Sequence, residues 1–145
     1  MNYLVKVASV ALLAAASSIV PAQAAAQDDT TFQGLGGKPG IRKIVATLIP
    51  LVLADPRIKE SFVDIDMKNL ATRLEEQFCE LSGGPCAYKG KDMVEIHDGL
   101  NITNAQFNAL AEDVQVAMAR AGIPARFQNK LMARLAPLQR GIVTK

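Results

Sequence analysis

The chain has 145 residues, half of them apolar, with 16 basic and 14 acidic side chains, two cysteines, no tryptophan and one histidine. This length corresponds to one domain, and a formal net charge of +2 without a basic run argues against a nucleic-acid partner. Two cysteines and one histidine also exclude a multi-cysteine zinc site, a disulfide-rich scaffold and a metal site built on two histidines.

The first 24 residues have the pattern of a secretory signal peptide. Lys6 supplies a basic start, residues 7–20 are apolar or small, and residues 22–24 form an Ala-x-Ala cleavage site. The apolar core of 14 residues is shorter than the roughly 20 that a membrane-spanning helix needs, so a retained anchor is the less favoured interpretation. We expect cleavage after Ala24, or alternatively after Ala26, and a periplasmic or secreted protein without membrane attachment. The mature chain of 121 residues is then nearly neutral, with 15 basic and 14 acidic side chains.

The rest of the chain predicts an all-α domain over residues 32–145, preceded by a small and polar, flexible segment over residues 25–31. Helical periodicity alternates with Gly and Pro breaks, and no stretch shows the strict alternation of a strand. The first helix follows the glycine-rich residues 35–40, and Pro50 is expected to kink or break its last turn. Its apolar residues, spaced by three and four, are Ile41, Ile44, Val45, Leu48, Ile49 and Val52.

A turn or short helix is expected from Asp55 to about Phe62, and Asp66 then caps a second long helix. Gly83, Gly84 and Pro85 end this helix. Its apolar stripe consists of Leu70, Leu74, Phe78 and Leu81.

Three further helices are predicted after the polar loop that reaches Lys91. A short one spans Met93 to Leu100, and a capping box of Thr103 and Gln106 opens a long one that ends at Ala121–Gly122. The last begins at Pro124, and Pro137 is expected to bend it. Its apolar face consists of Phe127, Leu131, Leu135, Leu138 and Ile142.

The single histidine lies in the short helix, where the spacing places Met93, Ile96 and Leu100 on its side, toward the core. One interpretation is a buried neutral His97 bonded to a backbone carbonyl. The other is an axial ligand of a heme iron, because a flat apolar cofactor needs apolar walls and one imidazole nitrogen binds the iron from one side. The second ring nitrogen would then donate to a carbonyl one turn back, near Met93 or Val94. Spacing alone leaves both interpretations open.

Several blocks together resemble the group 1 truncated hemoglobins, in that family's order and spacing across residues 32–142. The blocks are residues 32–37 (FQGLGG), 53–57 (LADPR) with Phe62, 66–70 (DMKNL), 83–93 (GGPCAYKGKDM), 97–103 (HDGLNIT) and 135–138 (LAPL). The resemblance implies a truncated globin-like two-over-two helical sandwich around one non-covalently bound heme b. It also implies that His97 is the proximal iron ligand.

The resemblance further implies which side chains contact the heme. Phe62 matches an aromatic residue on the porphyrin face, and Leu70 and Leu74 match distal positions. Arg73 matches a basic residue near a propionate. Met93, Ile102 and Phe107 match apolar contacts on the proximal side. Without the resemblance, the apolar residues among them are interpreted as ordinary core and Arg73 as a solvated surface charge.

The chain departs from the family at the distal hydrogen-bond donors. Where many members have a tyrosine late in the second helix and a glutamine on the distal helix, this chain has Ile49 and Leu74. The resemblance therefore implies an apolar distal pocket of Ile49, Leu70 and Leu74, with oxygen retained roughly ten- to a hundred-fold less well and carbon monoxide less affected. The alternative is that Pro50 displaces the end of the helix and that Gln77 then reaches the pocket.

Cys79 and Cys86 flank a short segment that contains two glycines, which let the chain turn back after the helix. In an exported protein such a pair is expected to form a disulfide, while the alternative is two free thiols. No Cys-x-x-Cys-His motif is present, which disfavours covalently attached c-type heme.

We therefore expect an exported heme b protein that binds oxygen, carbon monoxide or nitric oxide, with an electron-donating reductase as a further partner. One alternative is a heme-dependent redox enzyme, a nitric oxide dioxygenase or weak peroxidase. The other is a helical interaction module without heme. The sequence leaves open whether the protein is an enzyme.

Overall fold

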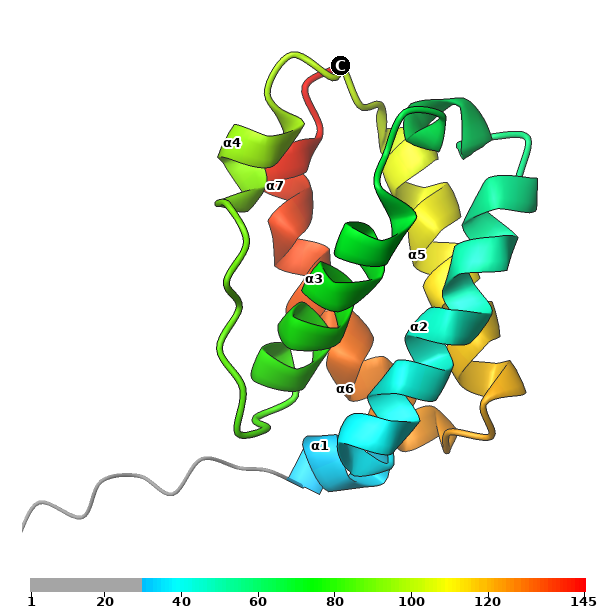
Figure 1. The fold of residues 1–145 in the computed structure, drawn as a ribbon, viewed down its shortest axis with the longest axis vertical. Coiled ribbons are helices and arrows are strands. Elements are labelled where there is room, and N and C mark those ends of the chain that lie inside the picture. The colour runs from blue at the N-terminus through cyan, green and yellow to red at the C-terminus, as the bar shows by residue number, and fades with distance from the viewer. Residues whose placement is uncertain (1–29) are drawn as a thin grey trace, which may run out of the picture.

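Helices form most of the protein in the computed structural model, which describes residues 30–145; the predicted signal peptide lies outside these described residues. No strand occurs in this part of the chain. The elements are α1 (Thr30–Gly34), α2 (Gly37–Ala54), η1 (Lys59–Phe62), α3 (Met67–Leu81), α4 (Met93–His97), α5 (Asn104–Arg120), α6 (Ala125–Leu135), η2 (Ala136–Leu138) and α7 (Gln139–Ile142), where η marks a 3₁₀ helix (Figure 1).

The long helices are arranged in two pairs. The most extensive contacts join α2 to α5 and α2 to α3, while α6 packs on both α5 and α3. The pair α2/α3 therefore covers the pair α5/α6, which is the two-over-two helical sandwich that we expected (Figure 1). The fully buried large side chains between the layers are Leu35, Ile41, Ile44, Val45, Leu48, Phe78, Met118 and Leu131.

The prolines act differently in the first and last helices. α2 continues through Pro50 to Ala54, so the break that we considered there does not occur. Pro50 has no N–H to donate to the carbonyl four residues earlier in the helix. Because Pro50 is exposed, water can bond to this carbonyl instead. The predicted last helix, in contrast, is divided, because α6 ends at Leu135 and a 3₁₀ turn containing Pro137 separates it from α7.

Two predicted helix starts are confirmed by their side chains. The Asp66 carboxylate accepts a hydrogen bond from the backbone N–H of Asn69 at 3.0 Å. At α5, the Thr103 hydroxyl accepts from the N–H of Gln106 while the Gln106 side chain accepts from the N–H of Thr103.

The N-terminal end of the described chain is already helical. Thr30 and Thr31, which we assigned to the flexible segment over residues 25–31, belong to α1, and Thr31 is buried. α1 lies close to α6, since a Cβ atom on Gly34 would stand 2.3 Å from the ring of Phe127. Glycine at this position therefore permits the close approach of the two helices.

The predicted disulfide is present. It joins Cys79, near the end of α3, to Cys86 in the following loop, with their Cα atoms 5.8 Å apart. This bond ties the loop that leads to α4 back to the end of α3.

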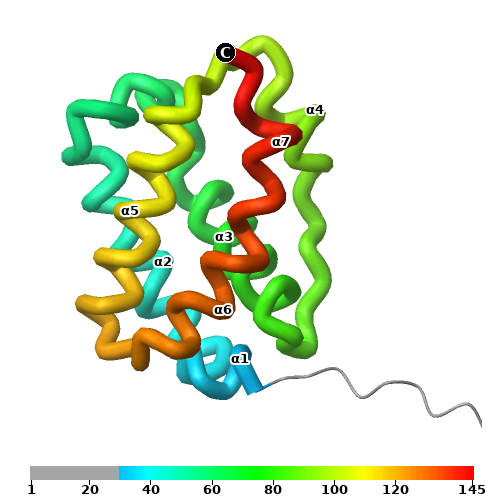
Figure 2. Tube along the Cα trace, turned by 180° about the vertical axis from the view of Figure 1, so that it is seen from behind, coloured from blue at the N-terminus to red at the C-terminus, as the bar shows by residue number. Residues whose placement is uncertain are grey.

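α4 and α7 lie side by side at one end of the molecule, as both views show (Figures 1 and 2). The C-terminus returns to the same end, where the N–H groups of Thr144 and Lys145 donate to the carbonyl of Ile102. Among the helices of residues 30–145, none has the length and apolar character needed to cross a bilayer.

Candidate heme site

His97 ends α4, a helix of one turn whose start is defined by a side-chain cap and whose end is defined by the backbone conformation that follows it. The Asp92 carboxylate caps its start by accepting from the N–H of Val94 at 2.8 Å. After His97, Gly99 (φ +73°) and Asn101 (φ +53°) adopt left-handed conformations that no helix continues through. The short helix therefore presents its histidine at a fixed position.

The imidazole ring has one anchored and one available nitrogen. Nδ1 of His97 lies 2.8 Å from the carbonyl oxygen of Met93, one turn back, as expected for a metal-binding histidine. Because a carbonyl oxygen only accepts, this bond places the proton on Nδ1 and leaves the lone pair of the neutral ring on Nε2. Nε2 has no hydrogen-bond partner among residues 30–145, and the side chain is half-buried.

The surroundings of His97 differ from the sequence prediction in two residues. Ile96 and Leu100, expected on the core side of the helix, are 45% and 56% exposed. The helix ends at His97, so Leu100 is not on the same helical face. Only Met93, which is half-buried, remains beside the histidine as predicted.

The face of α3 that carries the predicted distal residues is connected to α4. The amide nitrogen of Gln77 on α3 donates to the sulfur of Met93 on α4 at 3.3 Å. Leu70, Leu74 and Gln77 are spaced by four and three residues and so share one face of α3. The fold thus brings the predicted distal leucines onto the face of α3 that contacts the turn bearing His97.

The other predicted contact residues have the chemistry that a flat apolar cofactor requires. All are apolar and half-buried, and Ile49, Phe62 and Leu74 pack against the edge of the core. They come from α2, η1, α3, α4, the following loop and α5: Ile49, Phe62, Leu70, Leu74, Met93, Ile102 and Phe107. Within residues 30–145 no three His, Cys, Asp or Glu side chains gather into a metal site.

Arg73 already has a partner on its own helix. Its guanidinium contacts the Glu76 carboxylate at 2.7 Å, and the same carboxylate oxygen accepts from the N–H of Lys89 at 3.1 Å. The Lys89 backbone bond is the main cause that lowers the pKa of Glu76, and Arg73 adds to it. The expected contact of Arg73 with a propionate stays a prediction.

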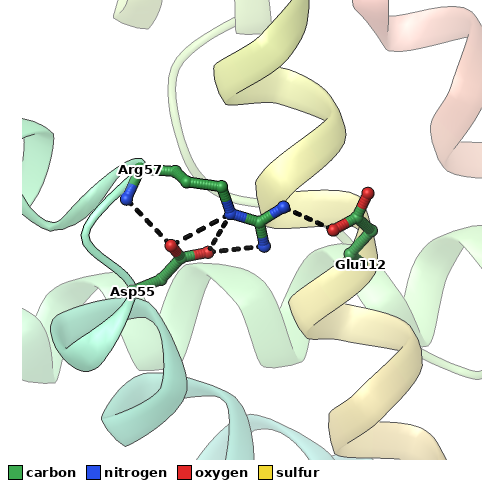
Figure 3. A network of polar contacts seen from close by, with 3 residues as sticks. All are labelled: Asp55, Arg57 and Glu112. Atoms are coloured by element: carbon green, nitrogen blue, oxygen red, sulfur yellow. Dashed lines mark hydrogen bonds and ion pairs between the residues drawn. The ribbon is translucent and has the colours of Figure 1, made fainter.

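A polar network at the corner after α2 was not predicted (Figure 3). The buried Asp55 carboxylate accepts from the backbone N–H of Arg57 at 2.8 Å and from its guanidinium, which also pairs with Glu112 on α5. The side-chain bond from Arg57 is the main cause that lowers the pKa of Asp55. The spacing of Asp55 and Arg57 around a proline could have indicated the bond between these two residues. Glu112 could not be found in this way, because it is distant in the sequence.

Next to this network, Asp113 on α5 is buried without a partner for its Oδ2 atom among the described residues. Burial, together with the negative charge of Asp55, raises the pKa of Asp113. The network of Asp55, Arg57 and Glu112 connects the end of α2 to α5, so we interpret it as structural.

Comparison with known proteins identifies the family of this chain. A family model described as bacterial-like globin matches residues 30–144. The group 1 truncated hemoglobin of Tetrahymena thermophila is 36% identical over 94 residues, which are 65% of this chain and 78% of that protein. The group 1 truncated hemoglobin GlbN of Mycolicibacterium paratuberculosis is 29% identical over 119 residues, 82% of this chain and 88% of that protein. The solved structure of Tetrahymena pyriformis truncated hemoglobin in the Fe(III) form superimposes with a TM-score of 0.76 at 29% identity, covering 79% of this chain and 98% of that one.

Proposed function

Because the chain belongs to the bacterial-like globin family and, within it, to the group 1 truncated hemoglobins, we propose that it is an exported heme b protein that binds a diatomic gas reversibly. One heme is held without a covalent bond, and His97 is the only protein ligand of its iron. An electron-donating reductase keeps the iron ferrous.

The observation that supports this proposal most directly is the state of the His97 ring. Nδ1 is bound to the carbonyl of Met93, which orients the ring and leaves the lone pair on Nε2. Since no described residue bonds Nε2, its lone pair is available to a ligand from outside the chain. When bound, heme supplies the iron that takes up the gas.

The predicted distal residues, on the side of the heme opposite His97, determine the polarity around the bound gas. Ile49, Leu70 and Leu74 offer no hydrogen-bond donor, and the amide of Gln77 on the same face is directed to the thioether of Met93. A thioether is a weak acceptor, so this contact positions the two side chains more than it stabilises them. We therefore expect weak oxygen retention and carbon monoxide affinity that is less reduced, since the bound oxygen is the more polar ligand.

Export to the periplasm or outside the cell is part of the proposal. It is supported by the signal-like pattern of residues 1–24 and by a disulfide, which is a feature of proteins in oxidising compartments.

Absorbance spectra of the ferric, ferrous and carbon monoxide-bound protein test the cofactor and its ligand together. We expect a Soret band from one heme per chain in the purified protein, and its loss in His97→Ala. Glu95→Ala, an exposed change on the same short helix, is the control and is expected to retain the band. Purified protein that neither contains heme nor takes it up when heme is added would contradict the proposal and favour the heme-free module.

A further inference from the structure

The disulfide forms part of the wall of a surface pocket of about 330 Å³, formed by the start of α2, the face of α3 that bears Glu75 and Glu76, and residues 85–89. None of the predicted heme contacts lines this pocket. We propose that it is a thiol–disulfide exchange site, in which a small anionic thiol reduces the Cys79–Cys86 bond. This proposal does not depend on heme binding.

The two sulfur atoms differ in access, which sets the direction of the exchange. Cys79 is 2% exposed, whereas Cys86 is half-buried. A small thiolate therefore attacks the sulfur of Cys86 and forms a mixed disulfide there, while the bond to Cys79 breaks and its electron pair stays on Cys79 as thiolate. A second thiolate attacks the small-molecule sulfur of the mixed disulfide and releases Cys86. In total, two small thiols are oxidised to their disulfide, and the protein disulfide is reduced to two thiols.

The charges around the pocket favour an anionic reductant. Of the two lining carboxylates, Glu75 faces Arg42 at 4.0 Å and Glu76 is paired with Arg73. Lys38 also lines the pocket, and no carboxylate of the described residues lies within ion-pair distance of it. A cation beside a disulfide attracts an anionic thiolate and stabilises the thiolate that leaves.

Reduction would free the loop that leads to α4. Besides the disulfide, the bonds that tie residues 85–92 to α3 are two backbone donations, from Tyr88 to the Glu80 carboxylate at 3.2 Å and from Lys89 to the Glu76 carboxylate at 3.1 Å. Both are exposed, and each such bond contributes little net stability. α4 itself packs mainly on α7. We therefore expect α4, with His97, to open more often once the disulfide is reduced.

The first experiment measures reduction of the folded, oxidised mature protein by rapid alkylation and intact mass. 2-Mercaptoethanesulfonate is compared with 2-mercaptoethanol at equal thiolate concentration and low salt. We expect the anionic thiol to react faster, and Lys38→Gln to lower that preference about two- to five-fold, the effect of one exposed charge. Lys130→Gln, an exposed change on α6 outside the pocket, is the control. Reduction only at the rate of global unfolding, or the same rate for both thiols, would overturn the proposal.

The second experiment tests the assigned direction of attack with single-cysteine variants. Cys79→Ser is expected to form a mixed disulfide at Cys86 with the oxidised small thiol at least ten times faster than Cys86→Ser forms one at Cys79. Equal rates would contradict the assignment. If either variant does not fold, hydrogen exchange of the wild-type chain decides: reduction is expected to speed exchange in residues 93–97 but not in α2, and uniform or unchanged exchange contradicts the release of α4.

Discussion

At the residue scale, Met93 bonds to His97 within α4 and to Gln77 on α3 through two different atoms. Its carbonyl oxygen orients the His97 ring, and its sulfur receives the amide of Gln77 from α3. Met93 thus links His97 to Gln77, through its backbone carbonyl on one side and its thioether on the other. The amide of Gln77 is therefore engaged with Met93 on the α3 face that also carries Leu70 and Leu74.

Restoring a donor on that face is expected to change gas release strongly. Leu74→Gln places an amide donor on the apolar face of α3, and we expect oxygen dissociation to slow by about ten- to a hundred-fold. Stopped-flow replacement of oxygen by carbon monoxide measures this rate. Gln77→Leu is the control and is expected to change the rate less than about three-fold. Wild-type release on a scale of seconds, or a large effect of Gln77→Leu, would refute an apolar distal side.

At the scale of elements, the segments between helices are fixed by local hydrogen bonds as well as by burial of apolar side chains. The cap of α5 is the clearest case, since Thr103 both donates its N–H to Gln106 and accepts from the N–H of Gln106. It fixes the start of the helix directly after Ile102, whose carbonyl also receives the C-terminal N–H groups.

Removing that cap is expected to lower the stability of the protein. Thr103→Ala leaves the first-turn donor without its partner, and we expect the free energy of unfolding to fall by about 1 kcal/mol. Thr72→Ala is the matched control, because its exposed hydroxyl only bonds to the Lys68 carbonyl within α3. Urea denaturation followed by circular dichroism measures both, and equal effects would argue against a role for the cap.

The disulfide stabilises the connection between α3 and α4 in a different way, by restricting the unfolded chain. Replacing both cysteines by serine removes a closed loop of eight residues, which is expected to lower the free energy of unfolding by roughly 2.5 kcal/mol. The double variant is compared with wild type in the same denaturation series. Unchanged stability would show that the bond constrains little in the unfolded state.

At the scale of the whole molecule, two buried carboxyl groups at the α2–α5 contact respond oppositely to pH. Asp55 has a lowered pKa, so its contribution to stability is present above the pKa of the unfolded chain and is lost as pH falls through the folded value. Asp113 has a raised pKa, so the folded state binds its proton more tightly, and stability falls as pH rises from the unfolded value through the folded one.

Neutralising Asp113 is therefore expected to change the pH profile of stability. Asp113→Asn removes the cost of the buried charge, so the variant gains stability relative to wild type at pH 7, and the gain shrinks as pH falls toward 4. Asp64→Asn, at an exposed position, is the control. Thermal denaturation between pH 4 and 8 gives the profiles, and a gain independent of pH would show that charge is not the cause.

The local features of this protein follow from its sequence because neighbours along the chain determine them. Apolar spacing identified the long helices, Asp66 and Thr103 marked helix starts, and the Cys79–Cys86 bond was expected from two cysteines around a glycine-containing segment. Pro137 was expected only to bend the last helix, which is in fact divided there. The resemblance of its motifs also indicated the family and the sandwich of helix pairs, both of which are confirmed.

Other features depend on residues that meet only in the folded chain. No periodicity indicates that Gln77 contacts Met93, that Arg57 joins Asp55 to Glu112, or that the disulfide lines a pocket beside Lys38. Likewise, Leu100 matched a helical pattern, but the helix stops before it at the left-handed residues 99 and 101. By itself the sequence indicated the long helices, the caps at Asp66 and Thr103 and His97 as a candidate ligand of iron, because these depend on local backbone preferences and residue chemistry. The tertiary structure alone decided which side chains surround His97, because contacts between distant segments depend on how the helices pack.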